Sequence, residues 1–128
     1  MRTPMVNPLV AILLLNYRNW QDTVACVESI QKISYENYSI LIVDNGSPNK
    51  SVSEMRSRLK DIQIIETGRN LGFTGGVNFA IKHALVLNPK YILNLNPDTF
   101  VEPQFLSCLV DALEENSKAA IAGGTIYH

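Results

Sequence analysis

Near the start of the chain stands Leu9-Val10-Ala11-Ile12-Leu13-Leu14-Leu15, an unbroken apolar run between Pro8 and Asn16. Continuous apolar runs of this kind are typical of strands that are covered on both faces, as in parallel sheets. The run is too short to span a membrane, and no signal-peptide cleavage pattern follows it. It therefore predicts a buried strand.

Further apolar runs follow, and segments with helical spacing of apolar residues separate them. A repeated strand-helix order predicts an α/β fold, with an open, mainly parallel sheet and helices on both faces. Residues 1–8 form a short polar lead, and residues 9–128 form one domain. The other predicted strands cover residues 38–43, 62–65, 91–95 and 119–122, and the predicted helices cover residues 20–33, 51–59, 77–87 and 105–113.

Composition excludes some classes of protein. Among 128 residues, 46% are hydrophobic and 18% are charged, which suits one folded domain rather than a disordered chain. The net charge of -1 predicts no nucleic-acid partner. Cys26 and Cys108 each lie in an apolar helical pattern, which predicts two reduced core thiols. We expect a cytoplasmic protein, and a peripheral association with the inner face of a membrane is compatible with the sequence.

Polar residues and glycines follow each of the first four predicted strands. Ligands of open parallel sheets bind outside the carboxyl ends of the strands. Four polar strand ends at one edge therefore predict a ligand cleft. The four segments are Asn16-Tyr17-Arg18, Asp44-Asn45-Gly46-Ser47, residues 70–78 and Asn96-Pro97-Asp98.

Each segment has a chemical use and a simpler structural explanation. Asp44 could accept a hydrogen bond from a base or a ribose, or it could form a turn with Asn45 and cap the next helix. Gly75 and Gly76 could bring backbone N–H groups close to a ligand, or they could make a tight turn. We expect Asn78 in the first turn of the helix that follows, where it reaches the cleft or caps the helix.

Asn96-Pro97-Asp98 directly follows a buried strand. A carboxylate at this point suits a hard divalent cation that is held jointly with a pyrophosphate. Such a cation would neutralise the charge that builds on a departing nucleoside diphosphate. The simpler explanation is that Asp98 caps the coming helix.

The ordered set of motifs resembles the family 2 glycosyltransferases of the GT-A fold, and in particular their rhamnosyltransferase-like branch. That resemblance implies a Rossmann-like, nucleotide-sugar-binding half of an inverting enzyme. The matching segments are Leu14-Leu15-Asn16-Tyr17, Val43-Asp44-Asn45-Gly46-Ser47, Asn70-Leu71-Gly72-Phe73-Thr74-Gly75-Gly76-Val77-Asn78 and Leu95-Asn96-Pro97-Asp98.

The resemblance also implies roles for individual residues. Asn16 and Tyr17 would line the base pocket, and Asp44 would contact the base or the ribose. Asn70 and the glycines after it would close over the nucleotide. Asp98 would bind Mg2+ or Mn2+, as the last aspartate of the family's D-x-D-type motif does.

Two features depart from the family pattern. Asn96 stands where the first aspartate of the D-x-D-type motif is expected, so the metal would receive one charge less. No residue maps onto the family's general base, which lies in a later segment that also builds the acceptor site. We therefore expect a domain truncated before its acceptor half, which binds the donor and transfers its sugar poorly.

The expected reaction transfers a hexose-type sugar from a nucleoside-diphosphate sugar to a saccharide or lipid-linked saccharide in polysaccharide synthesis. dTDP-rhamnose is the first candidate donor, ahead of UDP- and GDP-sugars. The alternative is a non-catalytic nucleotide-sugar-binding module or partner subunit. A sugar nucleotidylyltransferase would carry a glycine-rich loop after its first strand, where this chain has Asn16-Tyr17-Arg18-Asn19. A truncated domain would also expose apolar surface and could self-associate through it.

Overall fold

The computed structural model describes residues 7–116 and 118. Its four-stranded sheet is entirely parallel, with the order β3-β2-β1-β4. Each strand begins and ends within one residue of the predicted bounds. The predicted strand at residues 119–122 and most of the lead at residues 1–8 lie outside the described residues. The strands are β1 (Val10–Asn16), β2 (Tyr38–Asp44), β3 (Gln63–Glu66) and β4 (Tyr91–Leu95).

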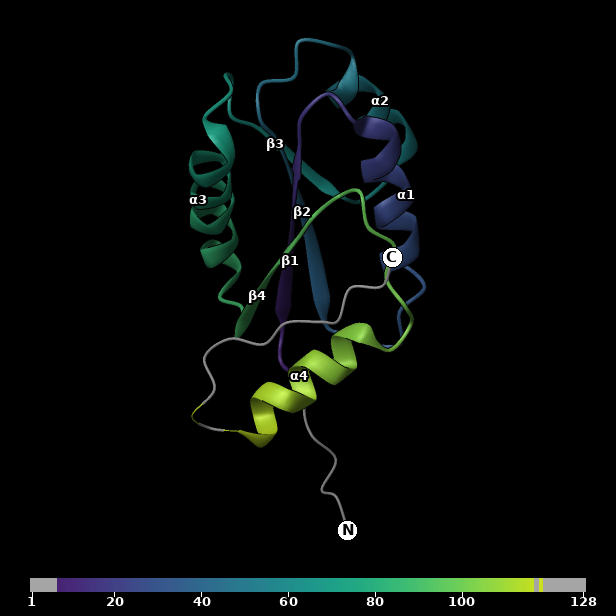
Figure 1. The fold of residues 1–128 in the computed structure, drawn as a ribbon, viewed down its shortest axis with the longest axis vertical. Coiled ribbons are helices and arrows are strands. Elements are labelled where there is room, and N and C mark those ends of the chain that lie inside the picture. Colours follow the sequence, from purple (N-terminus) through teal and green to yellow (C-terminus); the bar gives the residue numbers. More distant parts are fainter. Residues whose placement is uncertain (1–6, 117, 119–128) are drawn as a thin grey trace.

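Helices cover both faces of this sheet, as predicted. Helix α3 lies on one face, whereas α1, α2 and α4 pack on the other (Figure 1). No helix in the described ranges is long and apolar enough to cross a bilayer. The helices are α1 (Trp20–Ile30), α2 (Ser51–Arg58), α3 (Gly72–Ala84) with the short 3-10 helix η1 (Leu85–Leu87) after it, and α4 (Phe105–Glu115).

The alternation of side chains along β1 explains why its sequence is apolar throughout. Ile12 and Leu14 point into the core beneath α1, α2 and α4, while Leu13 packs against α3. Successive strand residues face opposite sides of a sheet, so a strand covered on both sides needs apolar residues at every position. Ala80 and Ala84 supply the small side chains that let α3 lie close to the sheet.

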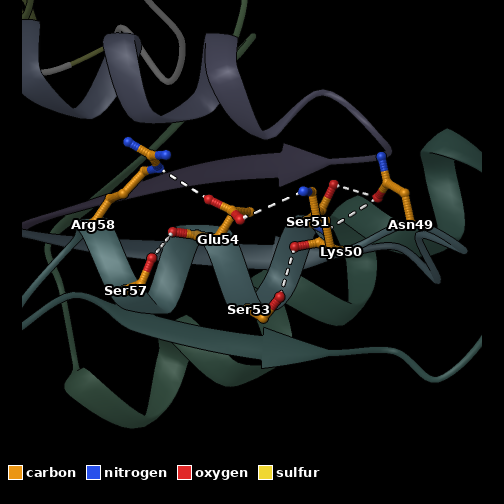
Figure 2. A network of polar contacts seen from close by, with 7 residues as sticks. All are labelled: Asn49, Lys50, Ser51, Ser53, Glu54, Ser57 and Arg58. Atoms are coloured by element: carbon orange, nitrogen blue, oxygen red, sulfur yellow. Dashed lines mark hydrogen bonds and ion pairs between the residues drawn. The ribbon is translucent and has the colours of Figure 1, made fainter.

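Helix α2 is short and polar, and side-chain contacts define its start (Figure 2). Asn49 Oδ1 accepts hydrogen bonds from the backbone N and the hydroxyl of Ser51, at 3.1 and 2.6 Å. One helical turn separates Glu54 from Arg58, whose Nε donates to the Glu54 carboxylate at 3.1 Å. Capping of a free N–H group and an i,i+4 ion pair both favour a helix that has little apolar surface.

Two sequence-based expectations about elements are wrong. Helix α3 begins at Gly72 and not at residue 77, so Gly75 and Gly76 lie inside a helix instead of a turn. Helix α1 ends at Ile30, about one turn before the expected residue 33. The later start was predicted because glycine has a low helix propensity. Tertiary contacts, described below, override this propensity in the structure.

The two cysteines have different surroundings. Cys26 is buried and free, as predicted, whereas Cys108 is exposed. Helix α4 buries Leu106 and Val110, which are four residues apart and share one face. Cys108 lies midway between them and therefore falls on the opposite side of the helix. The prediction of a buried thiol was wrong for Cys108.

Candidate functional site

A cleft of about 390 Å³ opens at the carboxyl edge of the sheet. Segments that lie far apart in the sequence meet there, because the ends of parallel strands share one edge. Of the predicted site residues, Tyr17, Asn45, Asn70, Asn96 and Asp98 all line the cleft. The structure therefore brings together residues from all four predicted segments.

Asn16 and Asp44 lie beneath the cleft and do not line it. Their side chains are 0% and 2% exposed, and Asn16 Nδ2 donates to Asp44 Oδ1 at 2.9 Å. The Thr23 hydroxyl donates to Asn16 Oδ1 at 2.6 Å. Asp44 also accepts hydrogen bonds from the backbone N and the hydroxyl of Ser47, at 2.9 and 2.7 Å.

These contacts use most of the polar capacity of the two side chains. A carboxylate offers roughly four acceptor positions, and Asp44 fills three of them inside the protein. The turn that we considered for Asp44 is therefore present. Direct contact of Asn16 or Asp44 with a ligand stays a prediction.

Asn45 holds the glycine-rich segment in place. Its Oδ1 accepts the backbone N–H of Leu71 at 3.0 Å, and its Nδ2 donates to the carbonyl of Gly72 at 3.0 Å. Asn70 Oδ1 accepts the backbone N–H of Gly72 at 2.8 Å. Free N–H groups at the start of a helix need such partners, and these two asparagines supply them. The contacts give the physical reason why α3 begins at Gly72.

The next residue, Gly46, allows the two loops to touch. Its φ is 78°, and a Cβ atom placed on it would lie 2.4 Å from the carbonyl carbon of Arg69 and 2.5 Å from the backbone N of Asn70. Only glycine combines a left-handed backbone with so close an approach. Gly46 thus keeps Asn70 next to Asn45 at the wall of the cleft.

The paired glycines of α3 do not line the cleft. Gly76 is buried, and a Cβ atom there would lie 2.7 Å from Leu15 Cδ1, so it permits close packing of α3 on β1. A Cβ atom on Gly75 would meet Leu71 Cβ at 2.9 Å. Asn78 is exposed and lies well past the first turn, away from the buried face that Gly76 shares with Ala80. A role in nucleotide binding for these three residues stays a prediction.

Asp98 lies at the cleft on a turn that the Thr99 hydroxyl closes by donating to the carbonyl of Asn96 at 2.6 Å. Within residues 7–116 and 118, no donor lies in hydrogen-bond range of its carboxylate. Helix α4 starts only at Phe105, so the alternative in which Asp98 caps that helix is wrong. The exposed carboxylate is therefore available to a ligand.

Helix α1 supports this turn from behind. The backbone N of Val101 donates to the Ser29 hydroxyl at 3.3 Å. The Cys26 thiol lies close to Thr99 and Asp98, and its pKa is raised, mainly because burial disfavours the thiolate. A neutral thiol leaves Asp98 as the charged group on this side of the cleft.

The donor set near Asp98 limits how a metal could bind. The described residues contain no group of three or more His, Cys, Asp or Glu side chains that could enclose an ion. Mg2+ and similar ions bind through one or two carboxylates when a substrate's phosphates and waters complete the shell. One free carboxylate with the Asn96 amide beside it fits such a shared site and does not fit a protein-only metal cage.

Some lining residues were not singled out individually from the sequence. Phe73 is 70% exposed, an unusual position for a phenylalanine and a signal that only the structure provides. Arg18, which follows the lining residue Tyr17 but does not itself line the cleft, has a positive φ of 65°, which is rare for a residue with a long side chain. Gly72, Phe73 and Pro97 line the cleft within the predicted segments, whereas Leu15 and Asn19 line it from positions outside the four segments.

The sequence pattern of the glycosyl transferase family 2 matches residues 11–128. The chain belongs to this family. An uncharacterized glycosyltransferase of Haemophilus influenzae is 29% identical over 119 residues, which cover 91% of this family 2 chain and 36% of that protein. The low-salt glycan biosynthesis hexosyltransferase Agl10 of Haloferax volcanii is 33% identical over 92 residues, or 70% of this chain and 27% of Agl10. The chain thus spans about a third of the length of these relatives.

Solved structures show that the family 2 chain has the GT-A fold. The mannosyltransferase PcManGT from Pyrobaculum calidifontis, in complex with GDP-Man and Mn2+, superposes with a TM-score of 0.73 at 18% identity, covering 86% of this chain and 33% of that one. S. aureus TarS 1-349 in complex with UDP-GlcNAc gives a TM-score of 0.65 at 18% identity, covering 83% of this chain and 31% of that one.

Proposed function

We propose that this chain supplies the donor site of an inverting, metal-dependent hexosyltransferase. The enzyme transfers a sugar from a nucleoside-diphosphate sugar to a saccharide or lipid-linked saccharide acceptor in polysaccharide synthesis. The observation that carries this proposal is the cleft at the carboxyl edge of a family 2 domain, with the Asp98 carboxylate, which has no hydrogen-bond partner among the described residues, in its wall. A donor such as dTDP-rhamnose is our first candidate, with UDP- and GDP-sugars next.

The residues around the cleft suit the parts of such a donor. The Tyr17 ring is 40% exposed and offers a stacking face for the base. Asn70 precedes α3 and Phe73 lies in the first turn of α3, and both line the cleft, where they would cover the nucleotide. Asp98 and Asn96 would hold Mg2+ or Mn2+ together with the diphosphate. The bound cation would supply charge neutralisation for the departing nucleoside diphosphate.

The reaction is a single displacement at the anomeric carbon. The bond from the acceptor oxygen to that carbon forms while the bond from the carbon to the phosphate oxygen breaks, so the configuration inverts. The acceptor proton passes to a carboxylate base, which we place in a segment of the full enzyme outside these 128 residues. We further propose a cytoplasmic location, with access to acceptors at the inner face of the membrane.

Relatives and structural neighbours support the donor class. PcManGT was solved with GDP-Man and Mn2+, and TarS with UDP-GlcNAc. Agl10 is named as a hexosyltransferase. The two ligands and the name of Agl10 are all compatible with a nucleotide-sugar donor. In the PcManGT complex, the divalent cation Mn2+ is present together with the nucleotide sugar.

Calorimetric titration of the chain with dTDP, UDP and GDP, each with and without Mn2+, tests the proposal. We expect one of them to bind more tightly when Mn2+ is present. Asp98→Asn keeps the shape of the side chain and removes its charge, and we expect it to weaken the Mn2+-dependent binding at least about tenfold, or ~1.4 kcal/mol.

Glu102→Gln is the matched control, because Glu102 is an exposed carboxylate on the same connection and does not line the cleft. It should leave the affinity unchanged. The metal role of Asp98 would be refuted if Mn2+ did not change the nucleotide affinity of the unmodified chain. It would also be refuted if both variants lost the same amount of affinity. Absence of binding by every nucleotide would refute the donor site.

A further inference from the structure

Arg18 has a backbone conformation that costs free energy. Its φ of 65° lies in the left-handed region, which is unfavourable for a residue with a Cβ atom. The Ser47 hydroxyl accepts its backbone N–H at 2.8 Å, and Asn49 Nδ2 donates to its carbonyl oxygen at 2.9 Å. The side chains of Ser47 and Asn49 thus bind both the backbone N–H and the carbonyl group of Arg18.

The same contacts connect Arg18 to the floor of the cleft. Ser47, which accepts from Arg18, donates to Asp44 at 2.7 Å, and Asp44 accepts from Asn16 at 2.9 Å. Asn49 also accepts the backbone N–H of Ser51, the first residue of α2 (Figure 2). Arg18 is therefore locked in its strained conformation by a network that starts at the buried ends of β1 and β2. Strain that is held this firmly is characteristic of functional positions.

The side chain of Arg18 lies beside a residue that lines the cleft. Its guanidinium carbon is 5.2 Å from the centre of the Tyr17 ring, and Tyr17 lines the cleft. Within the described ranges, the guanidinium forms no ion pair with a carboxylate. Two other arginines are engaged elsewhere, since Arg56 pairs with Glu66 at 3.5 Å and Arg58 stacks on Trp20 at 4.7 Å.

The negative charge at the cleft indicates why a positively charged side chain is useful there. Asp98 is its charged lining residue, and that charge is negative. A nucleoside diphosphate is also an anion, so its binding needs positive charge from the protein as well as from a metal. A guanidinium offers a planar fork of donors that matches two phosphate oxygens.

We propose that Arg18 binds the diphosphate of the donor from the rim of the cleft, and that the strained turn serves to present its guanidinium there. The inference rests on the proposed function and adds a residue to its site. With its ring beneath the guanidinium, Tyr17 supports the side chain and can still offer its other face to the base. Arg18 binds the donor and takes no part in the proton transfer.

Arg18→Asn provides the test, because asparagine tolerates the left-handed conformation but carries no charge. The variant should melt about 2–4 °C higher than the unmodified chain, since the strain is relieved. Calorimetry should show about tenfold weaker binding of whichever of dTDP, UDP and GDP the unmodified chain prefers. Binding of the corresponding nucleoside, followed by NMR titration, should change by less than about twofold.

The matched control is Arg56→Asn, which removes an arginine from the exposed side of α2 and should leave both affinities unchanged. Equal diphosphate affinity in Arg18→Asn and the unmodified chain would overturn this inference and leave the proposed function standing. An equal loss for nucleoside and diphosphate would also overturn it, because the effect would then come from the packing of Tyr17. Failure of the unmodified chain to bind any nucleotide would overturn both proposals.

Discussion

At the scale of single residues, Gly46 and Gly68 have the same backbone conformation in different surroundings. Their φ values are 78° and 84°. A Cβ atom on Gly46 would lie within 2.5 Å of the backbone at Arg69 and Asn70, whereas one on Gly68 would meet nothing within 4 Å. The pair therefore separates the cost of backbone strain from the cost of a steric clash.

We predict that Gly68→Ala lowers the free energy of unfolding by about 1 kcal/mol, from strain alone. Gly46→Ala should lower it by about 3 kcal/mol or more, because a clash with rigid backbone adds to the strain. Urea denaturation of both variants measures the difference. If the two substitutions cost the same, the close approach of the loops at Gly46 does not contribute to stability.

The sequence alone was sufficient to place Asp44, Asn45, Asn70, Asn96 and Asp98 at one edge of the sheet, because each follows a recognisable strand. It could not show that the side chains of Asn16 and Asp44 form a hydrogen bond with each other. That contact joins residues on two strands and depends on their register, in which Asn16 lies opposite Asp44. Pairings of this kind have no local signature in the sequence.

At the scale of elements, a polar contact fastens α4 to the start of β4. Lys90 Nζ lies 2.9 and 2.7 Å from the two Glu114 carboxylate oxygens, and the Tyr91 hydroxyl donates to Oε2 at 2.5 Å. The pKa of Glu114 is lowered, first by the hydrogen bond from Lys90 and then by the one from Tyr91. The pKa values of Lys90 and Tyr91 are raised, in both cases mainly by the hydrogen bond with Glu114.

A lowered carboxyl pKa predicts how this contact depends on pH. Its stabilising effect is fully present above the ordinary value of 4.5 and is lost as the pH falls through the lower pKa of the folded state. Urea midpoints from pH 3 to pH 7 should therefore show Glu114→Gln to be less stable near neutrality and closer to the unmodified chain in acid. Glu102→Gln should not reproduce this trend, and a gap that stays constant with pH would contradict the prediction.

The strands were easier to predict than the start of α3. A continuous apolar run such as Ile40-Leu41-Ile42-Val43 indicates a strand of a sheet that is covered on both sides. The glycines at 72, 75 and 76 indicate a loop by propensity, yet the structure has a helix there. Partners from the distant Asn45 and a close fit against Leu15 compensate for that propensity, and neither is visible locally.

At the scale of the whole molecule, an apolar surface lies beside β4, an edge of the described sheet. Leu85, Val86 and Leu87 are 58%, 84% and 41% exposed. A groove of about 370 Å³ between β4 and α4 adjoins Leu85. Contiguous apolar surface of this kind favours association.

We predict that the chain self-associates through this surface. Light scattering should show an apparent mass that rises with protein concentration, and Val86→Glu should keep the mass at that of a monomer over the same range. Gln63→Glu places the same charge at β3, the opposite edge of the described sheet, and should not prevent association. A monomeric unmodified chain at every concentration would contradict the prediction.

The wall of the cleft is held mainly from below, by buried side chains at the ends of β1 and β2, of which Asn45 also lines the cleft. Asn16, Thr23 and Asp44 secure one side, and the amide of Asn45 secures another. The exposed side chains of Tyr17, Phe73 and Asn96 form no hydrogen bond within the described ranges. If the proposed function is correct, evolution can exchange the residues at the surface of the cleft to suit a new base or sugar without endangering the fold, and the domain is then an adaptable starting point for new donor specificities.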